Sequence, residues 1–172
     1  MKTGKRYTVP FRRVREGKTN YKRRLNLLKG GKTRIVVRKS LKHIIIQAVD
    51  YHPAGDKVLA TVKSDELKKL GWKHSTGNTP AAYLTGLLAA KKISGLGREE
   101  FILDIGIHTP VKGSRIFAAL KGLVEGGLNI PHDESVLPDD ERTSGNHIAS
   151  FRKEAQSIAN DVEELKKKIS TI

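Results

Sequence analysis

Arginine and lysine side chains are frequent over the first 43 residues, and within residues 1–33 they are interleaved with Tyr7, Phe11 and Tyr21. Guanidinium groups bind phosphate oxygens in pairs, and aromatic rings stack on unpaired bases. We therefore predict that this segment binds RNA through two groups of residues. The first group lies near the N-terminus and contains Arg6, Phe11, Arg12, Arg13, Arg15, Lys18, Tyr21, Lys22, Arg23 and Arg24. The second group surrounds a predicted turn and contains Arg38, Lys39, Ser40, Lys42 and His43.

The net charge of the chain is concentrated in the same segment. Residues 1–42 contain 16 Lys and Arg and one acidic residue, Glu16, whereas residues 43–172 contain 17 basic and 17 acidic residues. The whole formal net charge of +15 is therefore carried by the first quarter of the chain. Such a charged segment attracts a polyanion without making the folded domain repel itself. A membrane surface is the weaker interpretation, because no sustained apolar face accompanies the cations.

A third candidate contact lies at Lys112, Ser114 and Arg115, just before a predicted helix. The first backbone N–H groups of a helix can bind phosphate oxygens, and a basic side chain beside them strengthens that site. Ser114 can equally act as a structural cap for the helix. The residues alone favour neither interpretation over the other.

Two Gly-Lys-Thr triplets, at residues 17–19 and 31–33, invite comparison with a nucleotide-binding loop. That loop requires another glycine five positions before the glycine of the triplet, and Arg12 and Asn26 occupy those places. Neither triplet follows a predicted strand and opens a helix. We predict no nucleotide site, no small-molecule substrate and no cofactor.

The sequence gives little support for catalysis. There is no cysteine, and the six histidines show none of the spacings typical of metal sites. Asp104 at a predicted strand end is a possible metal ligand of a nuclease, but no second carboxylate occupies a comparable position. Loop hydrogen bonding or capping is the simpler role for Asp104. We predict no metal site and no enzymatic activity.

The elements that position these residues can be predicted from local patterns. β-branched runs bounded by turn residues predict strands over 34–39, 43–49, 57–62 and 101–105. Capping residues and apolar spacing predict helices over 21–28, 64–70, 80–93 and 115–124, the second of them capped by Ser64. Strands that first cluster and then alternate with helices indicate an α/β domain, a small mixed sheet covered by helices.

The chain divides into three parts in this interpretation. Residues 1–33 are a basic arm, residues 34–130 an α/β core, and residues 131–172 an acidic connection followed by a C-terminal helix. The helix is predicted from apolar residues that recur every three or four positions, at Ile148, Phe151, Ala155, Ile158, Val162, Leu165 and Ile169. We expect it to pack on its own domain, with docking on another protein as the alternative.

The absence of cysteine and of any long apolar run bears on where the protein works. Disulfides are excluded, which agrees with an intracellular protein. The longest apolar runs, at 35–37 and 44–46, are far too short for a signal sequence or a membrane span. We therefore expect a soluble cytoplasmic protein.

Ordered blocks between Tyr7 and Ile148 resemble a known family. They are Val9-Pro10-Phe11-Arg12-Arg13, Arg15-Glu16-Gly17-Lys18-Thr19, Tyr21-Lys22-Arg23-Arg24-Leu25, Ile35-Val36-Val37-Arg38-Lys39-Ser40, Lys42-His43-Ile44, Gly71-Trp72-Lys73, Thr76-Gly77-Asn78-Thr79-Pro80, Leu103-Asp104-Ile105-Gly106, His108-Thr109-Pro110, Lys112-Gly113-Ser114-Arg115 and Ile130-Pro131-His132. Together they resemble the archaeal and eukaryotic branch of ribosomal protein 18 of the large subunit. The pattern departs from the family at Leu41, where we expect Asn. The short length favours an archaeal type.

The resemblance implies a compact α/β protein without catalytic activity. Its expected partners are 5S rRNA, the large-subunit rRNA and neighbouring ribosomal proteins, so its expected place is the ribosome. Its expected role is to bind 5S rRNA and help attach it to the large-subunit rRNA. Two alternatives stay open at this point: a metal-dependent RNA-processing enzyme built around Asp104, and an interaction protein outside the ribosome that docks through the C-terminal helix.

Overall fold

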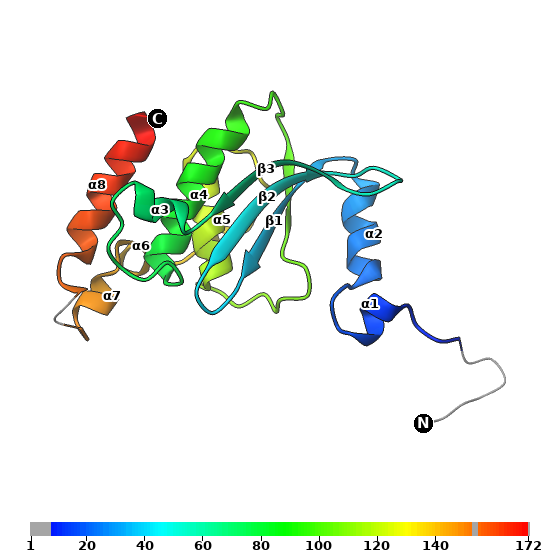
Figure 1. Cartoon of the computed structure of the whole chain (residues 1–172), viewed down its shortest axis with the longest axis horizontal. Helices are drawn as coiled ribbons and strands as arrows, with labels where there is room; N and C mark the ends of the chain where they lie inside the picture. The colour runs from blue at the N-terminus through cyan, green and yellow to red at the C-terminus, as the bar shows by residue number, and fades with distance from the viewer. Residues whose placement is uncertain (1–7, 153–154, 172) are drawn as a thin grey trace.

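The computed structural model describes residues 8–152 and 155–171, which are built around a four-stranded mixed sheet (Figure 1). The strands are β1 (Thr33–Lys39), β2 (Ile44–Asp50), β3 (Lys57–Lys63) and β4 (Phe101–Asp104). Their order across the sheet is β3-β2-β1-β4. Strands β1, β2 and β3 pair antiparallel in succession, whereas β4 pairs parallel with β1, so that Arg34 lies opposite Val49 on one side and Ile102 on the other.

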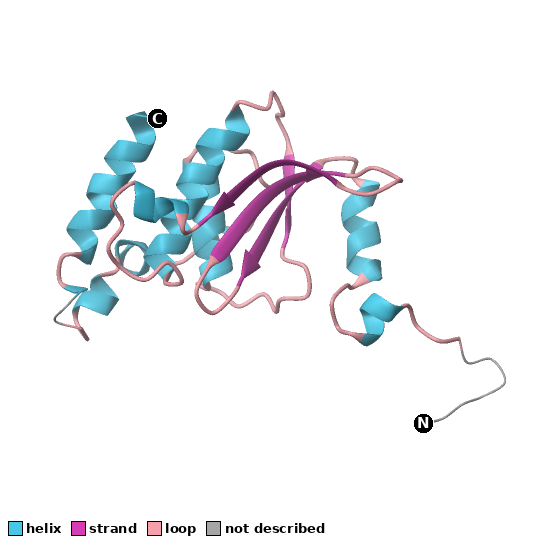
Figure 2. Cartoon of the chain, viewed as in Figure 1, coloured by secondary structure: helices cyan, strands magenta, loops and turns pink. Residues whose placement is uncertain are grey.

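Helices surround this sheet unevenly. In chain order they are α1 (Arg12–Arg15), α2 (Tyr21–Lys29), α3 (Glu66–Lys69), α4 (Thr79–Ser94), α5 (Arg115–Glu125), the 3-10 helix η1 (Glu134–Val136), α6 (Asp140–Ser144), α7 (Asn146–Ala149) and α8 (Ile158–Thr171). Helices α4 and α5 cover one face of the sheet, and α8 lies beyond them (Figure 2). Helices α1 and α2 lie at the opposite end of the molecule (Figure 1). The predicted α/β class with a small mixed sheet is confirmed.

The two faces of β1 have different chemistry because side chains alternate along a strand. Ile35 and Val37 are fully buried in the apolar core beneath α4 and α5. Arg34 and Arg38 therefore lie on the other face, which is the side nearest the N-terminal helices. The strand thus links the apolar core to a basic surface.

Helices α4 and α5 pack closely because glycines lie at their crossing. A Cβ placed on Gly86 would be 2.2 Å from the Ala119 carbonyl oxygen, and one on Gly122 would be 2.2 Å from the Tyr83 carbonyl oxygen. Real Cβ atoms do not approach so closely, so these positions need glycine for space and not for backbone conformation. The small residues bring the two helices together over the sheet.

Most local predictions are confirmed by the structure. Asn78 caps α4, its Oδ1 accepting the Ala81 N–H at 2.9 Å, and Pro80 occupies the first turn as predicted. Helix α2 begins at Tyr21 and ends before Gly30. The predicted helix over 64–70 is shorter, and its proposed cap is wrong. Ser64 is fully buried, and its hydroxyl accepts the Ile44 N–H at 3.1 Å, which joins the start of α3 to the sheet.

The predicted C-terminal helix is confirmed as α8, but its predicted continuous extent from Ile148 is wrong. The segment forms two helices, α7 and α8, and the intervening Phe151 is 89% exposed. Helix α8 begins after Ser157, whose carbonyl oxygen accepts the Asp161 N–H at 2.9 Å. The apolar stripe of α8 is nevertheless buried against its own domain, as predicted, through Ile158, Val162, Leu165 and Ile169.

Candidate nucleic-acid interface

A basic cleft of about 580 Å³ separates the N-terminal helices from the body. Its lining includes five cations and two carboxylates, together with uncharged residues such as Asn20, Tyr21 and Ile107. The cations are Arg13, Lys18, Arg23, Arg24 and Arg38, and the carboxylates are Asp56 and Asp104. These cations come from the arm and from β1, so the fold joins members of both predicted groups in one site. We refer to this site as the arm cleft.

Helix α2 is fixed to the body by its arginines. Asn20 caps the helix by accepting the Arg23 N–H at 3.0 Å, which fits the preference for Asn at this position. The Arg24 guanidinium donates to Asp56 Oδ1 at 2.7 Å in the β2–β3 turn, and Arg23 Nη1 donates to the Gly106 carbonyl at 3.3 Å. Arg23 and Arg24 thus orient the arm as well as supplying charge to the cleft.

A buried arginine, Arg34, links two carboxylates that line the cleft, Asp56 and Asp104. Arg34 is 2% exposed, and its guanidinium donates to Asp56 Oδ2 at 2.6 Å and to Asp104 Oδ2 at 2.9 Å. Asp104 Oδ1 also accepts the Gly106 N–H at 2.8 Å, which fixes the loop after β4. The hydrogen bond from Arg24, followed by that from Arg34, holds the pKa of Asp56 below its usual value despite partial burial.

This network was missed by sequence reasoning. Arg34 and Asp56 were given no role, although the simple loop role expected for Asp104 is confirmed by its bond to Gly106. No sequence pattern marks the pairing, since Arg34 and Asp104 are 70 residues apart. The only available signal was an arginine at the start of a predicted strand, where a charged side chain that becomes buried requires a partner.

The arm around α1 is held by local contacts. Arg12 and Lys18 pair with Glu16 at 2.6 and 2.8 Å, and Arg13 Nε donates to the Thr19 hydroxyl at 2.8 Å. These contacts shape the arm but leave its cations at the surface.

Two aromatic rings of the arm are in contact with each other. Phe11 and Tyr21 pack edge to face, with ring centroids 5.5 Å apart. Phe11 is 73% exposed, which leaves most of its ring free for a base. Within the described residues, the side chains of Arg15 and Lys22 have no hydrogen-bonding or ionic partner. Arg6 lies outside the described residues.

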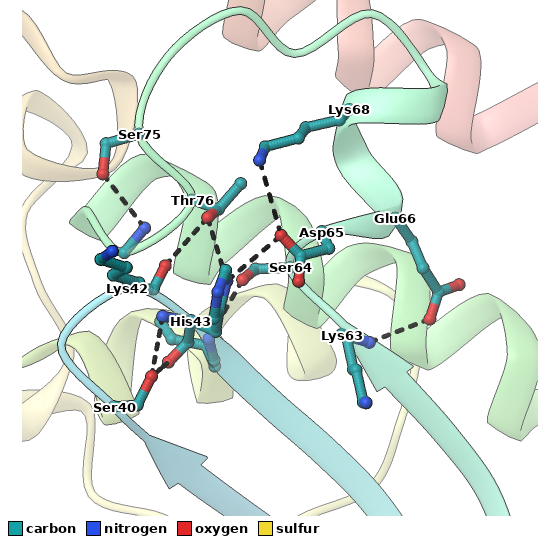
Figure 3. Close-up of polar contacts among 12 residues, drawn as sticks. Ser40, Lys42, His43, Lys63, Ser64, Asp65, Glu66, Lys68, Ser75 and Thr76 are labelled. Atoms are coloured by element: carbon teal, nitrogen blue, oxygen red, sulfur yellow. Dashed lines mark hydrogen bonds and ion pairs between the residues drawn. The ribbon is translucent and has the colours of Figure 1, made fainter.

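The second predicted group divides into residues that hold the β1–β2 turn and residues that present charge. Ser40 closes the turn, its hydroxyl donating to the His43 carbonyl at 3.0 Å and accepting the His43 N–H at 2.9 Å (Figure 3). His43 Nδ1 lies 3.2 Å from Asp65 Oδ1, and the Thr76 hydroxyl donates to the Lys42 carbonyl at 2.9 Å (Figure 3).

The charges of that turn are available for a ligand. Within the described residues, the side chains of Arg38, Lys39 and Lys42 have no polar partner. Burial, followed by the positive charges of Lys39 and Arg38, lowers the pKa of His108 in the loop after β4. His108 is thus an uncharged ring among cations at neutral pH. It belongs to this surface, although sequence reasoning gave it no role in binding.

The third candidate contact has mainly structural partners. Arg115 Nη1 donates to the Gly77 carbonyl at 2.6 Å and to the Ser40 carbonyl at 3.2 Å, which clamps the β1–β2 turn to the start of α4. Lys112 Nζ lies 3.3 Å from the Ser135 hydroxyl. Ser114 occupies the cap position of α5, yet its hydroxyl is buried and makes no hydrogen bond. None of these residues lines the arm cleft.

The described part of the chain offers no site for the alternative chemistry. It contains no group of three His, Asp or Glu side chains that could hold a metal ion. Asp104 is instead paired with Arg34. No helix within residues 8–152 and 155–171 is long and apolar enough to cross a membrane.

An α/β fold that carries a cationic cleft suits a protein that associates with RNA, and comparison with known proteins shows the family of this chain. Residues 5–98 and 95–133 match the family of ribosomal large-subunit proteins 60S L5 and 50S L18, and the chain belongs to that family. It is 49% identical over 165 residues to the large ribosomal subunit protein uL18 of Methanoregula boonei, covering 96% of this chain and 95% of the relative. It is 53% identical over 151 residues to uL18 of Methanothrix thermoacetophila, and this match covers 88% of this chain and 89% of the relative.

These similarities confirm several predictions. Both relatives are archaeal proteins of the large ribosomal subunit, in agreement with the predicted type. The family consists of structural ribosomal proteins, so the prediction that this chain is not an enzyme is also confirmed. The nuclease alternative is therefore set aside. The contacts of individual residues with RNA stay predictions.

Proposed function

We propose that this protein binds 5S rRNA through the arm cleft and the β1–β2 turn, and helps to attach that RNA to the large-subunit rRNA. The observation that carries the proposal is the cleft itself, in which five arginine and lysine side chains from the arm and β1 converge. Such a concentration of cations, with exposed aromatic rings beside it, matches the requirements of RNA better than those of any other ligand.

The cations serve two roles in this proposal. Arg15, Lys22, Lys39 and Lys42 bind phosphates, since their side chains are free of internal partners in the described residues. Binding releases condensed counterions from the RNA, which supplies much of the affinity and makes it dependent on salt. Arg23 and Arg24 instead hold α2 in place, so the cleft is shaped before RNA arrives. A preformed site loses less conformational entropy on binding.

The aromatic residues supply contacts that charge alone does not give. Phe11 and Tyr21 form an exposed edge-to-face pair at the mouth of the cleft. A base that leaves its helix at a loop or junction can stack on Phe11, whereas a regular A-form duplex offers no free base. We therefore expect the arm to bind a loop or junction of 5S rRNA, while the electrically neutral body directs it.

The proposal also assigns roles along the chain. Residues 1–33 act as the RNA-binding arm and residues 34–130 as the core that positions it. Residues 131–172 complete the domain through the packing of α8 on α4. Neighbouring ribosomal proteins are the remaining expected partners.

The test is the salt dependence of 5S rRNA binding by the full chain. The variant carries Arg15→Gln and Lys22→Gln, which remove two exposed charges without breaking an internal bond. The matched control carries Lys69→Gln and Lys167→Gln on α3 and α8, far from the cleft. Each lost phosphate contact lowers the slope of log affinity against log salt by about 1. We expect a slope reduced by about 2 for the arm variant and no change for the control.

Specificity is tested with an unrelated folded RNA of equal length. At physiological salt the full chain is expected to bind 5S rRNA at least about tenfold more tightly than this competitor. An unchanged slope for the arm variant refutes the proposed contacts. Equal affinity for both RNAs refutes the assignment to 5S rRNA.

A further inference from the structure

A second groove, of about 610 Å³, lies at the end of the molecule opposite the arm. Its walls are the β1–β2 turn, the loop before α4, and residues of α7, α8 and the described ends of the segment between them. The residues that line it are Leu41, Lys73, His74, Ser75, Gly77, Asn78, His147, Ile148, Phe151, Arg152, Ala155 and Ile158. We refer to it as the α7–α8 groove. None of the residues that line the arm cleft lines this groove, which shares with the proposed 5S rRNA surface only the β1–β2 turn, through Leu41.

Two large apolar side chains stand exposed at the rim of this groove. Leu41 is 93% exposed and Phe151 is 89% exposed. They come from segments about a hundred residues apart, and neither contributes to the apolar core. The floor between them is also apolar, with Ile148 half-buried and Ile158 fully buried. Clustered exposed apolar side chains over a hollow are typical of a contact surface and not of an isolated domain.

The charges around the groove are of one sign. Lys73 and Arg152 line it, and within the described residues neither side chain has a hydrogen-bonding or ionic partner. His147 is also part of the lining, whereas no Asp or Glu among the described residues is. Asp161 on α8, which is bonded to the lining residue His74, lies 2.7 Å from His74 Nε2 and accepts the Ser157 hydroxyl at 3.1 Å. The groove is therefore complementary to a ligand that carries both carboxylates and an apolar group.

The walls of the groove are fixed by internal bonds. His74 joins the loop before α4 to α8, and Trp72 Nε1 donates to the Ser75 carbonyl at 3.1 Å within that loop. The close approach of Gly77 to the β1–β2 turn leaves no room for a side chain, since a Cβ there would be 2.6 Å from the Leu41 carbonyl oxygen. A fixed groove needs little ordering when a partner binds.

We propose that the α7–α8 groove docks an acidic segment of another protein, with one bulky apolar side chain of that segment held between Leu41 and Phe151. The carboxylates of the segment face Lys73 and Arg152. A protein segment is favoured over RNA because the floor is aliphatic. Among the described lining residues, Phe151 is accompanied by two imidazole rings, and that of His74 is held by Asp161. RNA recognition relies on several stacking platforms and a dense field of cations, and the arm supplies those at the other end of the molecule.

The test measures binding of a labelled 12-residue peptide of Glu, Leu and Phe to the full chain by fluorescence anisotropy. The chain is first saturated with 5S rRNA, so that the cationic arm is not available to the peptide. An analogue with Gln in place of Glu tests the role of charge. We expect the acidic peptide to bind and the Gln analogue to bind at least about tenfold more weakly.

Groove variants locate the peptide. Leu41→Asn and Phe151→Ser are each expected to weaken binding about tenfold, and Arg152→Glu to weaken it similarly. Their matched controls outside the groove, Val58→Asn on β3 and Arg142→Glu on α6, are expected to leave the affinity unchanged. All these side chains are exposed, so the variants fold.

Three results would overturn the inference. The first is equal affinity for groove and control variants, and the second is loss of peptide binding on saturation with 5S rRNA, which would show that peptide and RNA compete for one surface. The third is binding of a ten-nucleotide oligouridylate to the saturated chain that the groove variants weaken, which would make the groove an RNA surface. If the chain does not bind 5S rRNA, the proposed function fails. The groove and control variants are then compared on the free chain, so that the groove is tested independently of RNA binding.

Discussion

Replacement of Asp56 by Asn tests whether the buried arginine network fixes the arm to the body. Asp56 accepts from Arg24 at 2.7 Å and from Arg34 at 2.6 Å, so Asp56→Asn weakens both bonds. Removing one partner of a fully buried ion pair lowers the free energy of unfolding by about 3–5 kcal/mol. Removing one partner of an exposed pair lowers it by about 0–1 kcal/mol. The Arg34 side chain is 3% exposed and that of Asp56 is 24% exposed, and Asp104 still pairs with Arg34. We therefore expect a loss of about 2 kcal/mol, which lies between these limits.

The assay is thermal and urea unfolding of both proteins at several pH values. A loss of about 2 kcal/mol lowers the melting temperature by roughly 4–8 °C for a chain of this size. The pKa of Asp56 is lowered in the folded protein, so its stabilising contribution is present above the unfolded pKa of about 3.9 and is lost as the pH falls through the folded value. The difference in stability should therefore begin to shrink below about pH 4, and the two proteins should converge only below the folded pKa of Asp56.

Two outcomes would refute this reasoning. One is equal stability of Asp56→Asn and the unmodified chain at pH 7. The other is a difference that persists unchanged at the lowest pH, because it would arise from something other than the charge. Glu16→Gln serves as the control, since Glu16 forms only exposed pairs with Arg12 and Lys18, and we expect no measurable change.

The packing and the turn give two further predictions. Gly86→Ala should lower the free energy of unfolding by about 1–3 kcal/mol in urea titration, because its Cβ would meet the Ala119 carbonyl. Gly95→Ala, at the open end of α4, should leave that free energy unchanged. Equal effects of the two substitutions would contradict the close helix crossing. Arg115→Ala should cost about 1–2 kcal/mol and speed hydrogen exchange in the β1–β2 turn, which that arginine clamps to α4; unchanged exchange would show that the clamp is not needed.

The elements with strong local signals were predictable from the sequence. Asn78 followed by Pro80 marks the start of α4 through hydrogen bonding and backbone geometry that involve neighbouring residues only. The C-terminal segment was predicted wrongly as one helix because its apolar spacing continues through Phe151, although that side chain points to solvent. The spacing of apolar residues indicates which segment can form an amphipathic helix, but it does not indicate where tertiary packing interrupts that helix.

The candidate site was predictable in composition but not in arrangement. A run of arginines is visible in the sequence, and it led to the residues that line the arm cleft. Which of them orient the arm was not visible, because Arg24 depends on Asp56, 32 residues away. Likewise, Arg115 suggested a phosphate contact, whereas in the structure it clamps two loops. Pairings between distant segments depend on the fold, and local patterns do not record them.

The most direct test of the central claim is a cryo-electron microscopy map of a large ribosomal subunit that contains this chain. The proposed function predicts nucleotides of 5S rRNA within hydrogen-bonding distance of Arg15, Lys22 and the cations lining the arm cleft, with a base against Phe11. A map in which these side chains face bulk water, far from any nucleotide, would contradict it.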